Sequence, residues 1–250
     1  APEAIREAAL ARLKIHSSEL LSCTVFRRGN DARKRHAILL VYTLDCEVKN
    51  EAAVLSRFAK DNHVKPTPDL EYRFVAKAPA GFSNRPVVIG AGPCGLLCAL
   101  VLAQMGFRPI ILERGKMVRE RTKDTWGLWR KSVLQPESNV QFGEGGAGTF
   151  SDGKLYSQIK DPRHLGRKVL TEFVKAEAPE DILTEAHPHI GTFRLVKMVE
   201  NIRATIEGLG GEYRWQSRVT DFEIDENRKL RGVVLESGER IAADHVVLAV

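Results

Sequence analysis

The fold is decided by Val87-Val88-Ile89-Gly90-Ala91-Gly92-Pro93-Cys94-Gly95. Its three β-branched apolar residues predict a short buried strand, and its glycines at G-x-G-x-x-G spacing predict a tight turn. The apolar run over 95–105 predicts a helix, and residues 109–112 predict the next strand. This order of strand, glycine turn, helix and strand is typical of a parallel α/β domain that binds a dinucleotide.

Each glycine of this motif has its own physical role. Gly90 allows the tight turn, Gly92 lets the backbone approach a pyrophosphate, and Gly95 lets the helix pack close to the strand. The helix N-terminus offers free N–H groups and a partial positive charge to phosphates. Glu113 lies 18 positions after Gly95, where a carboxylate accepts hydrogen bonds from a ribose diol and repels a 2′-phosphate. The motif therefore predicts a dinucleotide ligand and argues against NADP.

A second glycine-rich run, residues 143–153, contains five glycines in eleven residues. Successive free N–H groups in such a run form a nest for an anion. No GxxxxGK[ST] spacing fits, so the run is not a P-loop. Taken alone, it is better explained as a flexible loop.

Composition and charge exclude several classes of protein. Of the 250 residues, 43% are apolar and 28% charged, which is typical of a globular protein and excludes disorder and collagen-like repeats. The net charge of +6 is a mild excess. The four cysteines, Cys23, Cys46, Cys94 and Cys98, show neither CxxC nor zinc-site spacing, so we expect no metal site. Because they do not form a disulfide scaffold either, we expect a reducing compartment. The expected location is the cytoplasm, or the stroma or matrix of an organelle.

One segment is long and apolar enough to suggest a membrane span. Residues 87–107 carry no charge. Gly90, Gly92, Pro93 and Gly95 interrupt any helix near its start, so a buried strand, turn and helix explain the segment better. The chain also ends in an apolar strand-like run, 245–250, which suggests that the native protein continues.

The domain organisation is expected to change near residue 85. Residues 1–84 predict a small α+β module and residues 85–250 an α/β domain, with a Pro-containing linker over 65–85. In the module we expect helices 4–13 and 51–59, strands 20–26 and 37–48, and a polar turn over 27–35. In the α/β domain we further expect helices 116–132, 163–176 and 192–209 and strands 212–224, 230–235 and 240–250.

Four stretches carry a resemblance to a known family: 85–93 (RPVVIGAGP), 112–115 (LERG), 136–155 (PESNVQFGEGGAGTFSDGKL) and 188–192 (PHIGT). In these the chain resembles the FAD-dependent dehydrogenase-like flavoproteins, a group of the two-dinucleotide-binding-domain superfamily that includes glutathione reductase. The resemblance covers residues 85–250 firmly and the N-terminal module more loosely. It implies a Rossmann-like FAD-binding domain in which a parallel sheet is combined with a β-meander.

The resemblance also implies where FAD binds. The adenylate half would lie on the first βα turn, Glu113 would hold the adenosine ribose, and Val219 would contact the adenine through its backbone. Cys94 stands where the family usually has alanine, and the family continues past Val250 with a further flavin-contacting segment. The expected cofactor contacts are Gly90, Gly92, Pro93, Gly95, Glu113, Arg114, Gly145, Gly146, Ala147, Gly148, Thr149 and Val219; the catalytic residues are unknown.

Weaker candidates each have a structural explanation. His187 and His189 are either proton carriers or exposed loop histidines. Lys154 either stabilises a reduced flavin or is a surface lysine. Trp126 and Trp129 lie about one helical turn apart, a spacing that favours core packing over flavin stacking.

The predicted function is that of an FAD-dependent oxidoreductase that acts on a small-molecule substrate, with NAD(P)H as a candidate second partner. One alternative is an NAD-binding Rossmann dehydrogenase, because Glu113 suits both dinucleotides. The glycine-rich run favours FAD, whose flavin end needs a second loop. The other alternative is a nucleic-acid-binding N-terminal module beside a degenerate flavin domain. In that alternative the phosphate backbone would be bound by a basic turn, which consists of Arg27, Arg28, Arg33, Lys34, Arg35 and His36.

Overall fold

The computed structural model describes residues 2–155, 157 and 159–250. The chain divides into two compact units. Unit 1 is built from the described residues of Ala1–Glu71, Tyr156–Lys168 and Glu180–Pro188, and unit 2 from Tyr72–Leu155, Val169–Pro179 and His189–Val250. Residues 72–84 thus group with the α/β part. The two-domain division at residue 84 itself stays a prediction.

Unit 2 is organised around a four-stranded sheet with the order β5-β4-β3-β9. Every neighbouring pair in it is parallel, and in the central strand β3 all three residues are buried. Its strands are β3 (Val87–Ile89), β4 (Ile110–Leu112), β5 (Glu212–Arg214) and β9 (Val246–Leu248). The short apolar strands β3 and β4 are buried on both faces, as expected for the centre of a parallel sheet covered on either side.

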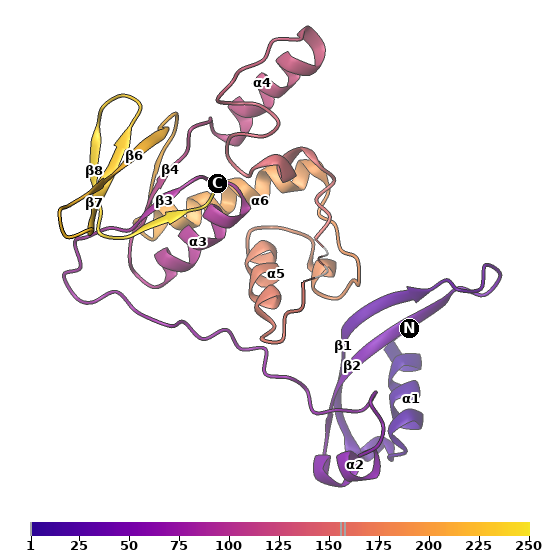
Figure 1. Cartoon of the computed structure of the whole chain (residues 1–250). Helices are drawn as coiled ribbons and strands as arrows, with labels where there is room; N and C mark the ends of the chain where they lie inside the picture. Colours follow the sequence, from indigo (N-terminus) through magenta and orange to yellow (C-terminus); the bar gives the residue numbers. More distant parts are fainter. Residues whose placement is uncertain (1, 156, 158) are drawn as a thin grey trace. The chain divides into compact units, whose positions relative to one another are not determined.

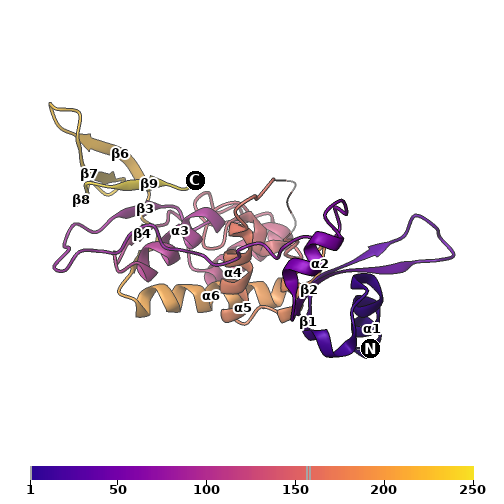
Figure 2. The same ribbon diagram turned by 90° about the horizontal axis from the view of Figure 1, so that it is seen from below.

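The sheet is the middle of three layers (Figure 2). One face carries the helices α3 (Pro93–Gln104) and α6 (Thr192–Gly208), which pack on each other and on the strands. The other face carries an antiparallel meander of β6 (Val219–Ile224), β7 (Leu230–Leu235) and β8 (Arg240–Ala242). The core between sheet and meander is formed by Val87, Ile89, Ile110, Leu112, Val233, Leu235, Ile241 and Ala243. This arrangement confirms the predicted Rossmann-like α/β fold with a β-meander.

Three further helical elements belong at least partly to unit 2. They are α4 (Val118–Lys131), the short 3-10 turn η2 (Ala147–Phe150) and the C-terminal part of α5 (Leu165–Lys175). Helix α3 ends where Gly106 takes a φ of +86°, the left-handed conformation that glycine adopts without strain.

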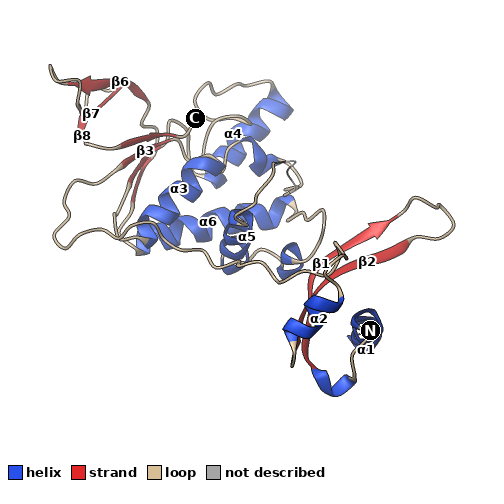
Figure 3. Cartoon of the chain, turned by 60° about the horizontal axis from the view of Figure 1, so that its bottom comes forward, coloured by secondary structure: helices blue, strands red, loops and turns tan. Residues whose placement is uncertain are grey.

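Unit 1 contains the first two α-helices and the first two strands of the chain (Figure 1). They are α1 (Pro2–Leu13), the long strands β1 (Leu20–Asp31) and β2 (Leu39–Val48), and α2 (Glu51–Arg57), with the 3-10 turns η1 (Ser17–Glu19) and η3 (Glu180–Leu183). The two strands form an antiparallel ribbon with irregularities at Leu20/Ser22 and Val25/Arg27. Helix, strand and loop segments of the whole chain are distinguished in Figure 3.

The structure corrects three expectations. Strand β1 continues to Asp31, so Arg27 and Arg28 lie in the strand rather than in a turn. The predicted strands 212–224 and 240–250 are each divided in two, because one half pairs in the parallel sheet and the other in the meander. Trp126 and Trp129 are 47% and 58% exposed, so they are not core residues.

The described part of the chain lacks two features. None of its helices is both long and apolar enough to cross a membrane. Among the same residues there is no group of three or more His, Cys, Asp or Glu side chains arranged to hold a metal ion.

Candidate functional site

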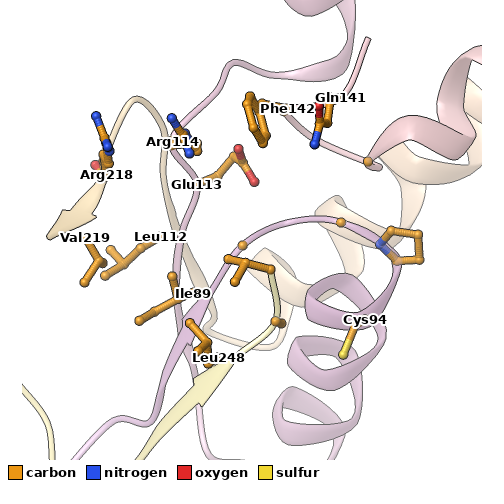
Figure 4. Close-up of a pocket in the computed structure, with 18 of the residues that line it drawn as sticks. Ile89, Cys94, Leu112, Glu113, Arg114, Gln141, Phe142, Arg218, Val219 and Leu248 are labelled. Carbon is orange, nitrogen blue, oxygen red and sulfur yellow. The ribbon is translucent and has the colours of Figure 1, made fainter. Parts of the chain in front are cut away.

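A cavity of about 710 Å³ opens at the carboxyl ends of β3, β4 and β9 (Figure 4). Ligands of open α/β sheets bind at this edge, next to the point where the strand order reverses. The cavity is lined entirely by unit 2, from the βα turn, the end of β4, the glycine-rich run, the start of β6 and the last residues of the chain.

The turn after β3 supplies the floor of the cavity. Gly90 has a φ of +101°, and a Cβ there would lie 2.6 Å from the Ala249 carbonyl oxygen. Gly92 is the N-cap of α3, and the first helical hydrogen bond runs from the Leu96 N–H to the Gly92 carbonyl. The N–H groups of Cys94 and Gly95 precede that bond, so they have no acceptor within the helix. This helix N-terminus can bind an anion.

Glu113 holds the turn in place from the end of β4. Its side chain is 4% exposed, and its two carboxylate oxygens accept hydrogen bonds from the Ala91 and Gly115 N–H groups, each at 2.7 Å. A carboxylate oxygen accepts more than one hydrogen bond, so both oxygens retain capacity for a hydroxyl donor. Glu113 also lines the cavity, which puts that capacity within reach of a ligand diol.

The glycine-rich run is tied to the βα turn. The Gly145 N–H donates to the Ala91 carbonyl at 2.8 Å, and the Glu144 N–H donates to the Lys116 carbonyl at 3.2 Å. A Cβ on Gly146 would lie 2.8 Å from Cδ of Pro93, so the run and the start of α3 are in close contact. The run is therefore a fixed wall of the cavity and not an unattached loop.

Arg121 organises this wall, and the sequence analysis missed it. The side chain is fully buried, and its guanidinium donates to the carbonyls of Asn139 (2.8 Å), Val140 (2.7 Å), Glu144 (2.6 Å) and Gly146 (2.8 Å). It also lies over the Phe150 ring, 4.8 Å from the ring centre. Burial lowers the pKa of Arg121 to about 10, so it remains charged at neutral pH. An arginine in a polar helix gives no sequence signal for such a role.

A second buried charge lies next to Arg121. Glu144 accepts a hydrogen bond from the Val118 N–H at the start of α4 and pairs with Arg203 at 3.0 Å. Burial raises the pKa of this carboxyl, against the opposing effects of the Val118 N–H and Arg203. Glu144 thereby joins the glycine-rich run to both α4 and α6.

The lining of the cavity also includes an aromatic ring and two arginines. The Arg114 guanidinium lies 4.3 Å from the centre of the Phe142 ring and pairs with Glu137. This pairing holds the pKa of Glu137 below its usual value. Arg218 lies 3.7 Å from the same carboxylate. An aromatic face and a guanidinium plane suit the stacking of a planar ring.

The cavity brings together seven of the twelve predicted cofactor contacts. They are Gly90, Gly92, Pro93, Glu113, Arg114, Gly146 and Val219. The other five, Gly95, Gly145, Ala147, Gly148 and Thr149, do not line it. Gly95 packs against the backbone of Gly90 in the turn, and Gly145 packs against Thr149 within the glycine-rich run. The Thr149 hydroxyl lies 3.4 Å from the Arg121 guanidinium. That these residues bind a cofactor stays a prediction.

The weaker candidates lie outside this lining. Lys154 and His189 form an isolated antiparallel bridge, and Lys154 pairs with Asp152 at 3.1 Å. His187 belongs to unit 1 and His189 to unit 2. In the basic segment of unit 1, Arg28 pairs with Glu185 and Arg33 with Asp31, so two of its charges are already balanced.

The close contact between Gly146 and Pro93 predicts that a side chain at position 146 destabilises unit 2. Gly146 has a φ of +64°, and its Cβ would meet Pro93, so Gly146→Ala is expected to destabilise unit 2 by about 2 kcal/mol. Gly148→Ala is the matched control two residues on, with nothing within 4 Å of a Cβ, and should change stability little. All three tryptophans belong to unit 2, so urea unfolding followed by tryptophan fluorescence measures both variants. Equal midpoints would contradict the prediction.

Comparisons with known proteins place the chain beside a longer relative. It is 38% identical over 242 residues to a Clostridium beijerinckii protein described as "Uncharacterized protein". The alignment covers 96% of this chain and 44% of that protein, so the chain spans less than half of its relative's length. No family model matches the chain.

Three solved structures of similar fold are each at most 20% identical to the chain, with TM-scores below 0.5. Thermovibrio ammonificans THI4 is 17% identical with a TM-score of 0.43, covering 66% of this chain and 57% of that one. The 3-ketosteroid-Δ4-(5α)-dehydrogenase of Rhodococcus jostii is 14% identical with a TM-score of 0.41, covering 69% and 47%. The structure of OTEMO in complex with FAD and NADP is 20% identical with a TM-score of 0.40, covering 69% and 26%.

The fold and the site together define the class of this protein. Unit 2 is a Rossmann-like α/β domain with a glycine turn at the first helix, an acidic residue at the end of the second strand and a β-meander on one face of the sheet.

Proposed function

We propose that unit 2 binds FAD and that the protein is an FAD-dependent oxidoreductase acting on a small molecule. The proposal depends on one observation. The glycine-rich wall is hydrogen-bonded to the same βα turn that carries Glu113 and the start of α3, so one cavity presents two glycine segments and a carboxylate. An extended dinucleotide with a flavin end needs such a second glycine segment.

The residues of the cavity fit this ligand chemically. Glu113 has free acceptor capacity for the ribose diol, and the N–H groups at the start of α3 suit the pyrophosphate. Phe142 and Arg114 in the cavity lining offer planar faces to the adenine. When bound, the flavin supplies hydride-transfer chemistry, and the protein supplies binding, orientation and electrostatics. NAD(P)H is the proposed electron partner, and cytoplasm is the proposed location.

Gly92 allows the proposal to be tested with little change in the fold. Its φ is −71°, and a Cβ there meets only the Gly146 Cα, at 3.9 Å. We expect wild-type protein to bind FAD in a titration followed by visible absorption and flavin fluorescence. Gly92→Ala should weaken binding roughly tenfold or more, because its methyl group occupies the approach of the pyrophosphate.

A matched control and a competing ligand make the experiment decisive. Gly208→Ala adds the same methyl group at the end of α6, with nothing within 4 Å, and should bind FAD like the wild type. NAD is titrated in parallel, because the Glu113 carboxylate also suits its ribose. Saturation by NAD without FAD binding would replace the flavin proposal with the NAD-dehydrogenase alternative. Binding of neither would reject both for this chain.

A further inference from the structure

Two cysteines face each other across the β1–β2 ribbon of unit 1. Cys23 and Cys46 are directly paired residues in the antiparallel register, and their sulfur atoms lie 3.8 Å apart. Both are free thiols and partly buried. Because directly opposed side chains of an antiparallel pair point to the same face, the contact follows from the register and not from a chance rotamer.

The ribbon geometry allows a bond between these sulfurs. Directly opposed residues of antiparallel strands have Cα atoms about 4.5–5.5 Å apart, which falls within the range of disulfide-linked cysteines. The pairing is regular over Ser22–Glu47, Cys23–Cys46, Thr24–Asp45 and Val25–Leu44, and the irregularities lie on either side of this segment. Closing the sulfurs to the length of a disulfide therefore needs side-chain rotation and no change of register.

Cys46 is also within reach of a small oxidant. It lines a cavity of about 750 Å³ bordered by α1, β2, α2 and residues 63–67, all within unit 1. The other two cysteines belong to unit 2 and lie one helical turn apart on α3. Within the described residues, Cys23 and Cys46 thus form a thiol pair that the FAD proposal does not use.

We propose that Cys23 and Cys46 form a reversible disulfide site, oxidised by a small-molecule disulfide such as oxidised glutathione. One cysteine sulfur attacks the glutathione disulfide as a thiolate, and the first glutathione leaves. The second cysteine sulfur then attacks the mixed disulfide, the Cys23–Cys46 bond forms, and the second glutathione leaves. The two cysteines lose two electrons and two protons, which are recovered in two glutathione thiols.

The surroundings of the pair determine how fast it reacts. Burial, followed by the nearby Cys23 and the charge of Asp45, raises the pKa of Cys46 to about 12. Since the thiolate is the attacking form, oxidation is expected to be slow at neutral pH and to need minutes to hours of exposure. The pair is therefore suited to sustained oxidation rather than to rapid turnover.

The bond should also change the behaviour of unit 1. A two-stranded ribbon is marginally stable by itself, and a cross-link between its strands removes freedom mainly from the opened state. Hydrogen exchange of amides in β1 and β2 should slow by at least roughly tenfold in the oxidised protein.

The experiment uses the full chain with all four cysteines. The protein is incubated with mixtures of reduced and oxidised glutathione, remaining thiols are alkylated, and peptides are mapped by mass spectrometry. We expect a cross-linked peptide pair that contains Cys23 and Cys46, is two hydrogens lighter than the reduced pair and is restored by reductant. Slower exchange in β1 and β2 should accompany it.

Matched variants keep the result interpretable. A protein carrying both C94S and C98S retains the pair and should form the same cross-link, whereas Cys46→Ser and Cys23→Ser should each abolish it. Stable glutathione adducts on Cys23 or Cys46 without a cross-link would overturn the proposal. So would complete alkylation of both thiols after the oxidising incubation.

Discussion

Gly95→Ala is expected to destabilise unit 2 by at least about 3 kcal/mol, at or beyond the upper end of overpacking costs. A Cβ on Gly95 would lie 1.9 Å from the Gly90 carbonyl oxygen and 2.9 Å from its carbon. Both atoms are backbone atoms of the tight turn after β3, so no side-chain rotation relieves the clash. Helix α3 would have to move away from the sheet, which would open the floor of the cavity.

The change is measured by urea unfolding with tryptophan fluorescence, since Trp126, Trp129 and Trp215 all report on unit 2. Gly127→Ala is the matched control in the interior of α4, where the nearest atom lies 3.9 Å away. That substitution should leave stability unchanged or raise it by about 0.5–1 kcal/mol, because alanine favours helix. If Gly95→Ala unfolded at the same urea concentration as wild type, the close packing of α3 on the turn would be wrong.

Arg121→Met should cost about 3–5 kcal/mol and loosen the glycine-rich wall. Methionine fills much of the same volume but leaves the carbonyls of Asn139, Val140, Glu144 and Gly146 without their buried donor. Each buried acceptor that loses its partner costs about 1–3 kcal/mol, and the structure relaxes to recover part of that loss. Arg121→Lys should recover only part of the stability, because one ammonium cannot replace the planar fork.

Hydrogen exchange and urea unfolding together distinguish a specific role of Arg121 in holding the glycine-rich wall from a general effect of removing a charge from α4. Hydrogen exchange of peptides from 139–150 should rise sharply in Arg121→Met, along with lower stability in urea. Arg119→Met is the control two residues earlier on α4; its Arg119 side chain is 69% exposed and pairs with Glu200. Surface ion pairs contribute about 0–1 kcal/mol, so that variant should behave nearly as wild type. Similar effects of the two substitutions would show that Arg121 does not hold the wall.

These two residues also bear on the FAD proposal. Gly95 positions the floor and Arg121 the wall, yet neither lines the cavity. Variants at both positions should therefore weaken FAD binding together with stability, whereas Gly92→Ala should weaken binding alone. That contrast distinguishes residues that build the site from the residue that the ligand approaches.

The local signals in the sequence predicted most of the helices and strands of unit 2. The glycine spacing after 87–89, the apolar runs and the position of Glu113 are properties of neighbouring residues, and each specifies one strand, turn or helix. The same signals predicted the strands of the meander, although they joined β5 to β6 and β8 to β9, and the meander itself was implied by the family resemblance. Where a strand leaves one sheet for another depends on its distant partners, which a local pattern does not contain.

Only the tertiary structure decided which side chains are buried and what they hold. The spacing of Trp126 and Trp129 predicts a shared helix face but not whether the core covers that face, and here it does not. Arg121 is charged, so sequence alone places it in solvent; its burial is stable only because carbonyls 18–25 residues away converge on it. The contact between Cys23 and Cys46 likewise depends on strand register, which is fixed by pairing along the whole ribbon.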